Sequence, residues 1–183
     1  MHPSTILFFI NLFFILFVSG FTAGSSSTTM TIANRCSIKV YPGILHVAGT
    51  SVPFTTGFSL QPGESKVLTM SDSWWGKLWG RTYCSTDSKG MFTCLTGECA
   101  SSTMECDGRD STSPVTFAEF NLNTNSNGFD YFGVSVVNGY NLPMMVQPQV
   151  GGGCGDCLMT SYATDTFHGV CVSTNYLVTF CPM

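Results

Sequence analysis

Hydrophobic and polar residues alternate along short stretches of this chain, most clearly through Thr116–Leu122. Phe117, Glu119 and Asn121 fall on one side of this stretch, and the residues between them fall on the other. Because successive side chains of a β-strand point to opposite faces, a period of two predicts a half-buried strand. Helical periodicity is almost absent from the rest of the chain.

The other expected strands are short and are separated by turn-forming residues. They are Met30–Ala33, Ile38–Tyr41, Ser65–Met70, Lys77–Tyr83, Asp130–Val137, Leu142–Gln147 and Tyr176–Phe180. Pro42-Gly43 is expected to end the second of these strands. Many short strands joined by Gly, Pro and Asn turns predict an all-β sandwich or barrel in one domain.

The first residues form an apolar run, Ile6–Val18, which small residues follow up to Ser27. This order is typical of a secretory signal peptide, although the usual basic n-region is missing. The alternative is a membrane anchor, but the run is shorter than the ~20 residues of a spanning helix. We therefore expect a signal peptide over residues 1–27 and a secreted, extracellular domain over residues 28–183, with no membrane association in the mature form.

The chain carries few charges and has a net charge of -4. An acidic protein has no electrostatic attraction to nucleic acid or to anionic membranes. We therefore expect no nucleic-acid partner.

Nine cysteines occur between Cys36 and Cys181. In a secreted chain such cysteines pair as disulfides, and an odd number leaves at least one without an internal partner. The gaps between Cys84, Cys94, Cys99 and Cys106 do not match a zinc site. We expect neither a metal nor a cofactor.

Seven segments together make the sequence similar to the thaumatin-like proteins, the pathogenesis-related group 5 family of plants. They are TIANRC (31–36), LQPGES (60–65), KLWGRTYC (77–84), GMFTCLTGEC (90–99), TFAEFNL (116–122), NGYNLPMMVQP (138–148) and TNYLVTFCP (174–182). The chain resembles the small form of the family, which lacks most of the cysteine-dense second lobe. The resemblance implies a flattened antiparallel β-sandwich of about ten strands with disulfide-stapled loops.

The resemblance also implies a disulfide pattern. The implied pairs are Cys36–Cys181, Cys84–Cys94, Cys99–Cys106 and Cys154–Cys171, which leaves Cys157 unpaired. A Cys154–Cys157 bridge with a free Cys171 is the alternative. The protein is then a monomer or a dimer linked through Cys157.

In larger members of the family, one basic and four acidic residues line a cleft between the lobes. The resemblance places Lys77 at the basic position and Glu119 and Asp165 at two acidic positions. Gly133 and Asn138 replace the other two acids. Hydrolysis of a glycosidic bond usually needs two suitably spaced carboxyl groups, so this loss argues against an enzyme, and we assign no catalytic residue.

Aromatic residues offer another binding route, because exposed rings stack on sugar faces. Trp74 and Trp75 are the candidates, although Trp79 is expected in the core and the pair itself can instead pack a loop. The leading hypothesis is a secreted antifungal defence protein that binds a cell-wall polysaccharide such as β-1,3-glucan. One alternative is an inhibitor of microbial glycanases that docks through the irregular segment Val47–Phe58, and another is a weak endo-β-1,3-glucanase.

Overall fold

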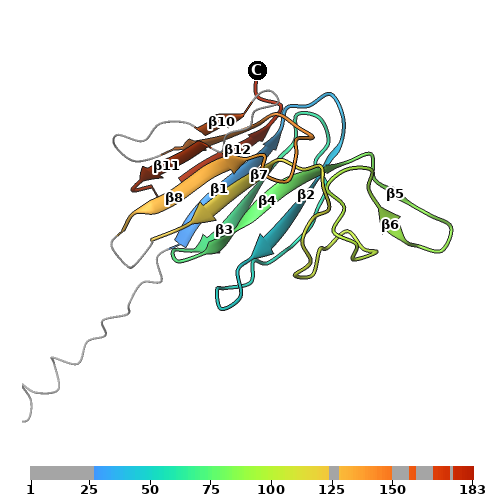
Figure 1. Ribbon diagram of the computed structural model, residues 1–183, viewed down its shortest axis with the longest axis horizontal. Helices are drawn as coiled ribbons and strands as arrows, with labels where there is room; N and C mark the ends of the chain where they lie inside the picture. The colour runs from blue at the N-terminus through green and yellow to red at the C-terminus, as the bar shows by residue number, and fades with distance from the viewer. Residues whose placement is uncertain (1–26, 124–127, 150–156, 160–166, 174) are drawn as a thin grey trace, which may run out of the picture.

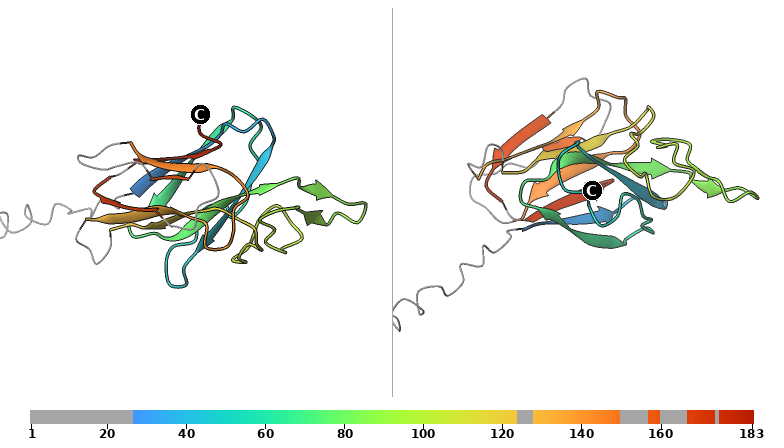
Figure 2. Two further views of the ribbon diagram at one scale, coloured as in Figure 1. Left: turned by 45° about the horizontal axis from the view of Figure 1, so that its top comes forward. Right: turned by 90° about the horizontal axis from the view of Figure 1, so that it is seen from below.

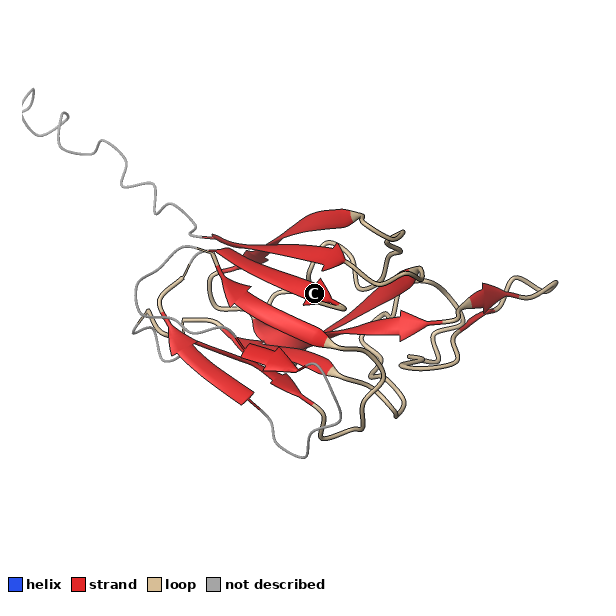
Figure 3. Ribbon diagram, turned by 90° about the horizontal axis from the view of Figure 1, so that it is seen from above, coloured by secondary structure: helices blue, strands red, loops and turns tan. Residues whose placement is uncertain are grey.

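Two β-sheets pack face to face in this protein, as Figures 1 and 2 show. The computed structural model describes residues 27–123, 128–149, 157–159, 167–173 and 175–183. These residues form strands and loops, and none of them lies in a helix (Figure 3). The fold is therefore the all-β, largely antiparallel sandwich that the sequence predicts. No described segment forms a helix able to cross a membrane.

Sheet A has the strand order β10-β9-β12-β1-β3. Its strands are β1 (Ser27–Asn34), β3 (Ser65–Ser71), β9 (Met144–Pro148), β10 (Cys157–Met159) and β12 (Asn175–Phe180). The first strand runs parallel to the last, with Met30 opposite Tyr176, and the other pairs in this sheet are antiparallel.

Sheet B has the strand order β11-β8-β7-β4-β2, and all of its pairs are antiparallel. Its strands are β2 (Val40–His46), β4 (Trp75–Thr82), β7 (Phe117–Asn121), β8 (Asp130–Ser135) and β11 (Phe167–Cys171). Ala118 and Phe120 face the core, as their alternation with Glu119 predicts.

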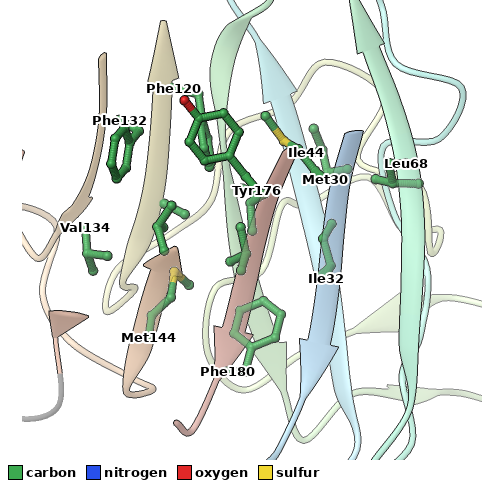
Figure 4. Close-up of a cluster of buried hydrophobic side chains, with 14 of the residues drawn as sticks. Met30, Ile32, Ile44, Leu68, Phe120, Phe132, Val134, Met144, Tyr176 and Phe180 are labelled. Carbon is green, nitrogen blue, oxygen red and sulfur yellow. The ribbon is translucent and has the colours of Figure 1, made fainter. Parts of the chain in front are cut away.

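The main core lies between the two sheets and consists of apolar side chains from both (Figure 4). Tyr176 is central to it: its ring centroid lies 5.3 Å from that of Phe120 and 5.3 Å from that of Phe132. Burial of the apolar side chains in this core stabilises the sandwich by about 25 cal/mol per Å² of apolar surface.

A smaller core lies on the other side of sheet B, under a lobe of disulfide-bonded loops. Trp79 and Phe117 are fully buried there against the Cys99–Cys106 bridge. The Trp79 indole N–H donates a hydrogen bond to Gly97 O at 2.7 Å. Beside this lobe, β5 (Ser85–Thr86) and β6 (Phe92–Thr93) form a two-stranded arm that extends away from the sandwich (Figure 1).

Arg81 connects this lobe to sheet B from a fully buried position. Its guanidinium donates hydrogen bonds to Tyr41 O, Pro42 O and Met104 O, at 3.0, 3.2 and 2.6 Å. Burial lowers the pKa of Arg81 to about 10, although the charges of Glu98 and Glu105 oppose this effect. The backbone carbonyls thus satisfy a buried cation that has no hydrogen-bonded carboxylate.

Three disulfides join described residues: Cys36–Cys181, Cys84–Cys94 and Cys99–Cys106. These are pairs that the resemblance implies. Cys171 is disulfide-bonded as well, which contradicts the alternative in which it carries the free thiol. Cys154 lies outside the described residues, so the pair Cys154–Cys171 and the unpaired state of Cys157 remain predictions.

The expectation that Pro42-Gly43 ends a strand is wrong. Instead, β2 continues through both residues to His46, with Pro42 opposite Gly80 of β4. Proline is tolerated in this strand because β2 is the edge strand of sheet B in the order above. Sequence patterning also missed the short strands β5 and β6, and it missed β10 and β11.

Candidate functional site

A cleft of about 450 Å³ lies over sheet B, beside the end of β2 and the start of β4. The cleft is lined by Leu45, His46, Val47, Trp75, Gly76, Lys77, Glu119, Phe120, Asn121, Tyr131 and Phe132. Four neighbouring strands thus contribute to one site, although their residues are far apart in the sequence.

The strand register decides which side chains meet in this cleft. Trp75 lies opposite Asn121, which lies opposite Tyr131, so these residues form one row across three strands. The next row on the same face contains Lys77, Glu119 and Gly133, because side chains of one face recur every second residue.

The row between these two points into the core and supports the cleft from below. It includes Phe120 and Phe132, both of which contact Tyr176. The Tyr176 hydroxyl donates a hydrogen bond to Asp130 Oδ2 at 2.6 Å, and Asn123 N donates to Asp130 Oδ1 at 2.8 Å. These bonds tie the floor of the cleft to the turn between β7 and β8.

Burial raises the pKa of Asp130, and the hydrogen bonds from Tyr176 and Asn123 oppose that rise only in part. Burial, together with the nearby Asp130 carboxylate, also holds the pKa of Tyr176 above its ordinary value. Both groups are therefore structural: the Tyr176 phenol stays protonated and donates to a carboxylate inside the core.

Two aromatic side chains are accessible at the cleft. Trp75 is 49% exposed and Tyr131 is 45% exposed, and they stand at the two ends of the row that contains Asn121. Sequence reasoning did not single out Tyr131, although its place in an alternating strand, one residue after Asp130, was a usable signal.

The prediction that Trp74 binds a ligand is wrong. Its side chain is fully buried, with its ring centroid 6.3 Å from that of Phe120. The next residue, Trp75, begins β4 and is half-exposed, so the two adjacent rings lie in different environments. Trp75 alone stays available for contact.

Lys77 lies in the cleft, but its charge is partly neutralised. Its Nζ is 2.9 Å from Asp110 Oδ2 and 4.1 Å from the centroid of the Phe117 ring. Asp110 was not a candidate in the sequence analysis, because it follows the last cysteine of the lobe and carries no motif. The pair is half-exposed, so its contribution to stability is small.

Glu119 is the carboxylate of the cleft among the described lining residues. It lies opposite Lys77 on one side and Gly133 on the other. Gly133 stands where the family resemblance implies an acidic residue, and it adds no side chain to the site. The predicted third site residue, Asp165, lies outside the described residues. The structure thus brings together Lys77, Glu119 and Trp75, and it adds Asn121 and Tyr131.

A loop of residues Val47–Thr55 protrudes beside the cleft, beyond the end of β2 (Figure 1). Val47 lines the cleft, and its N–H donates to Trp75 O at 2.8 Å. Phe54 is 100% exposed in this loop. A fully exposed phenylalanine leaves its ring in contact with water, and burial of this ring against a partner would be favourable.

Comparison with known proteins supplies the family context. The chain matches the model of the thaumatin family over residues 34–171. It is 42% identical over 170 residues to thaumatin-like protein 1 from Arabidopsis thaliana, with 90% of this chain and 65% of that protein covered. It is 41% identical over 150 residues to a glucan endo-1,3-beta-glucosidase from Prunus avium, with 82% and 60% covered. The chain thus spans less than two thirds of the length of these relatives.

A solved structure of a thaumatin-like xylanase inhibitor is also similar. Its TM-score is 0.64 at 28% sequence identity, and the match covers 84% of this chain and 99% of the inhibitor.

Proposed function

Because the chain belongs to the thaumatin-like, pathogenesis-related protein family, we propose that it is a secreted defence protein that binds a cell-wall polysaccharide such as β-1,3-glucan. The observation that carries this proposal is the row Trp75–Asn121–Tyr131, in which two half-exposed rings flank an amide over one cleft. Aromatic rings stack on the C–H faces of sugars, and amide and carboxylate groups hydrogen-bond their hydroxyls.

The spacing of the two rings suits an extended glycan. Two strand spacings separate the backbone positions of Trp75 and Tyr131 by about 10 Å, and a span of this length accommodates two consecutive sugar rings. Glu119 lies in the neighbouring row and the net charge is -4, so a neutral glycan fits better than an anionic one.

Binding to insoluble polysaccharide tests this function. We expect the mature protein to bind insoluble β-1,3-glucan, and both Trp75→Ala and Tyr131→Ala to weaken binding about tenfold, since each removes a stacking ring. Val67→Ala, which removes an exposed apolar side chain from sheet A, is the matched control and should bind as the wild type does. Equal binding by all four proteins would refute the assignment of the cleft.

We also propose that hydrolysis is not part of this function. A glycosidase usually needs two carboxyl groups about 5 Å or about 6.5–9.5 Å apart. Among the described lining residues Glu119 is the carboxylate present, and Asp110 at the margin is paired with Lys77. We expect reducing-sugar release from laminarin to stay at background. Hydrolysis at ordinary enzyme rates that Glu119→Gln abolishes would contradict this expectation.

Inhibition of a microbial glycanase is the second candidate. It is favoured by the similarity to a solved xylanase inhibitor and by the fully exposed Phe54 in a protruding loop. Parallel capture on insoluble glucan and on immobilised xylanase separates the two functions. Capture by the xylanase alone would favour inhibition over polysaccharide binding.

A further inference from the structure

The carboxylate of Glu105, in the Cys99–Cys106 loop, is hydrogen-bonded to the C-terminal end of the protruding loop Val47–Thr55. It accepts hydrogen bonds from the hydroxyls of Thr55 and Thr56, at 2.7 and 2.8 Å, and from the backbone N–H of Thr56. Three donors from two successive residues satisfy one carboxylate. Burial alone would raise the pKa of Glu105, but these hydrogen bonds outweigh it and lower the pKa.

Further contacts between the two loops restrain this junction. The Thr56 hydroxyl accepts hydrogen bonds from Cys106 N and Asp107 N, at 3.1 and 3.0 Å. A Cβ added to Gly57 would lie 1.9 Å from Met104 O, so the two backbones touch. Because Arg81 also donates to Met104 O, the contact reaches the buried guanidinium beneath.

The near end of the loop is fixed by sheet B. Val47 N donates to Trp75 O, and the Thr50 hydroxyl lies 2.8 Å from Val47 O and 3.2 Å from Trp75 O. Thr56 O accepts from Ile44 N of β2. Both ends of Val47–Thr55 are thus anchored, while Phe54, next to the Glu105 junction, is wholly in solvent.

An anchored loop with an exposed aromatic tip is suited to insertion into a concave partner. A loop that is already ordered in the free protein loses little conformational entropy when it binds. Pro53 also restricts the backbone beside Phe54. The loop residues Val47–Thr55 carry no charged side chain. A glycosidase cleft holds two carboxyl groups, so a neutral tip enters it without like-charge repulsion, whereas the acidic remainder of this protein would be repelled.

From these contacts we propose that Val47–Thr55 is a preformed docking loop whose Phe54 tip enters the substrate cleft of a glycanase, and that Glu105 is its positioning residue. This inference rests on the inhibitor function proposed above. Glu105 does not touch the partner. It acts by holding Thr55 and Thr56, and through them the adjacent Phe54, in the docking conformation.

The test is a double-mutant cycle on inhibition of a purified fungal endo-xylanase, measured by reducing-sugar release from xylan. We expect Phe54→Ala to raise the inhibition constant about 30-fold, as loss of an aromatic hot spot does. We expect Glu105→Gln to raise it about fivefold, because a neutral amide forms weaker hydrogen bonds to Thr55 and Thr56 than the carboxylate does, which loosens the loop. In the Phe54→Ala background, Glu105→Gln should add less than about twofold.

Two matched variants serve as controls. Leu95→Ala removes an exposed apolar side chain from the neighbouring lobe, and Glu98→Gln alters a carboxylate that accepts hydrogen bonds from Cys94 N and Ala100 N within that lobe. Both should inhibit as the wild type does. Hydrogen exchange of the Thr56 amide should accelerate in Glu105→Gln and not in Glu98→Gln, and thermal unfolding identifies any variant that is not folded.

The possible outcomes distinguish the docking loop from the inhibitor function on which it rests. If the wild type inhibits and Phe54→Ala and Glu105→Gln inhibit equally well, the inhibitor function stands and the assignment of Val47–Thr55 as the docking loop is wrong. Additive effects of the two substitutions would refute the positioning role of Glu105. If the wild type inhibits none of a panel of purified xylanases, the inhibitor function fails and the inference fails with it. A change in self-association alone would assign the loop to a second copy of this chain and overturn the proposal.

Discussion

Single side chains set the electrostatic character of the cleft. Lys77 directs its ammonium to Asp110, so Glu119 is left as the acidic group in the lining described here. Gly133, beside Glu119 in the register, adds no charge where an acidic residue was expected from the family pattern. Among the described lining residues, the site therefore combines one carboxylate with two exposed rings.

Asp130 gives a prediction for the pH dependence of stability. Its pKa is raised by burial in the folded state, so the folded protein binds this proton more tightly than the unfolded chain. The stabilising contribution is complete below the unfolded pKa of about 3.9 and is lost as pH rises through the folded pKa. Asn cannot ionise, and the Tyr176 hydroxyl can turn to accept from its amide. We expect Asp130→Asn to equal or exceed the wild type in unfolding free energy at pH 7.

Denaturant unfolding at pH 4 and pH 7 checks this prediction. The difference between Asp130→Asn and wild type should shift in favour of the variant as the pH rises. Glu105→Gln is a control of opposite sign. The pKa of Glu105 is lowered in the folded state, so the stabilising contribution of its carboxylate is lost as the pH falls below about 4.3. A large destabilisation of Asp130→Asn at pH 7 would mean that its hydrogen bonds outweigh the cost of the buried charge.

At the scale of elements, alternation predicted β3, β4 and β7, which the structure contains with bounds close to those expected. Thr116–Leu122 was predicted with its faces correctly assigned, because Ala118 and Phe120 alternate with Glu119. Alternation failed for β2, where Pro42 and Gly43 are turn residues by composition but lie in an edge strand. It also failed for Trp74 and Trp75, since two identical neighbours carry no signal for which one faces the core.

Gly43 has a packing role in β2 that explains why a turn-forming residue lies inside a strand. A Cβ at this position would lie 2.7 Å from two carbons of the Trp79 ring. We expect Gly43→Ala to lower the unfolding free energy by about 1–3 kcal/mol, the usual cost of overpacking. Chemical denaturation measures this change.

A second substitution distinguishes steric crowding from a change in backbone entropy. In a Trp79→Phe background the clashing part of the indole is gone, so Gly43→Ala should cost less than it does alone. If the cost is the same in both backgrounds, crowding against Trp79 is not its cause.

At the scale of the whole molecule, the start of β1 limits where the expected signal peptide can be removed. Ser27 pairs with Ser71 and Thr28 with Met70 in sheet A, and Thr28 is buried. A signal peptidase cut near Ser27 would keep this pairing from Thr28 onward, whereas a cut further along would remove part of β1. N-terminal sequencing of secreted material should find a start close to residue 28. A start at Met1 or within Ile6–Val18 would contradict the prediction.

Covalent closure of the sandwich also belongs to this scale. The Cys36–Cys181 bridge joins the loop after β1 to the residue after β12, across a sequence separation of 145. In the chain-entropy model, a bridge across so long a loop stabilises by about 4 kcal/mol or more. The sequence alone could not give this pairing; the family resemblance did, because cysteine spacing leaves the connectivity open.

The odd cysteine gives the last prediction: Cys157 is a free or intermolecular thiol, and Cys154 pairs with Cys171. Cys171 is disulfide-bonded, so its alternative role as the unpaired cysteine is already contradicted. Cys157 is the first residue of β10, which ends the strand order of sheet A. In an oxidising compartment an unpaired thiol favours a disulfide-linked dimer.

Alkylation followed by non-reducing peptide mapping tests this assignment. The label, or an intermolecular disulfide, should occur at Cys157, and a peptide that joins Cys154 to Cys171 should be recovered. Cys157→Ser should abolish the dimer band on a non-reducing gel and leave thermal stability unchanged, because no internal bridge is lost. Label on Cys154, with Cys157 joined to Cys171, would show that the free thiol has been assigned to the wrong member of the CGDC segment.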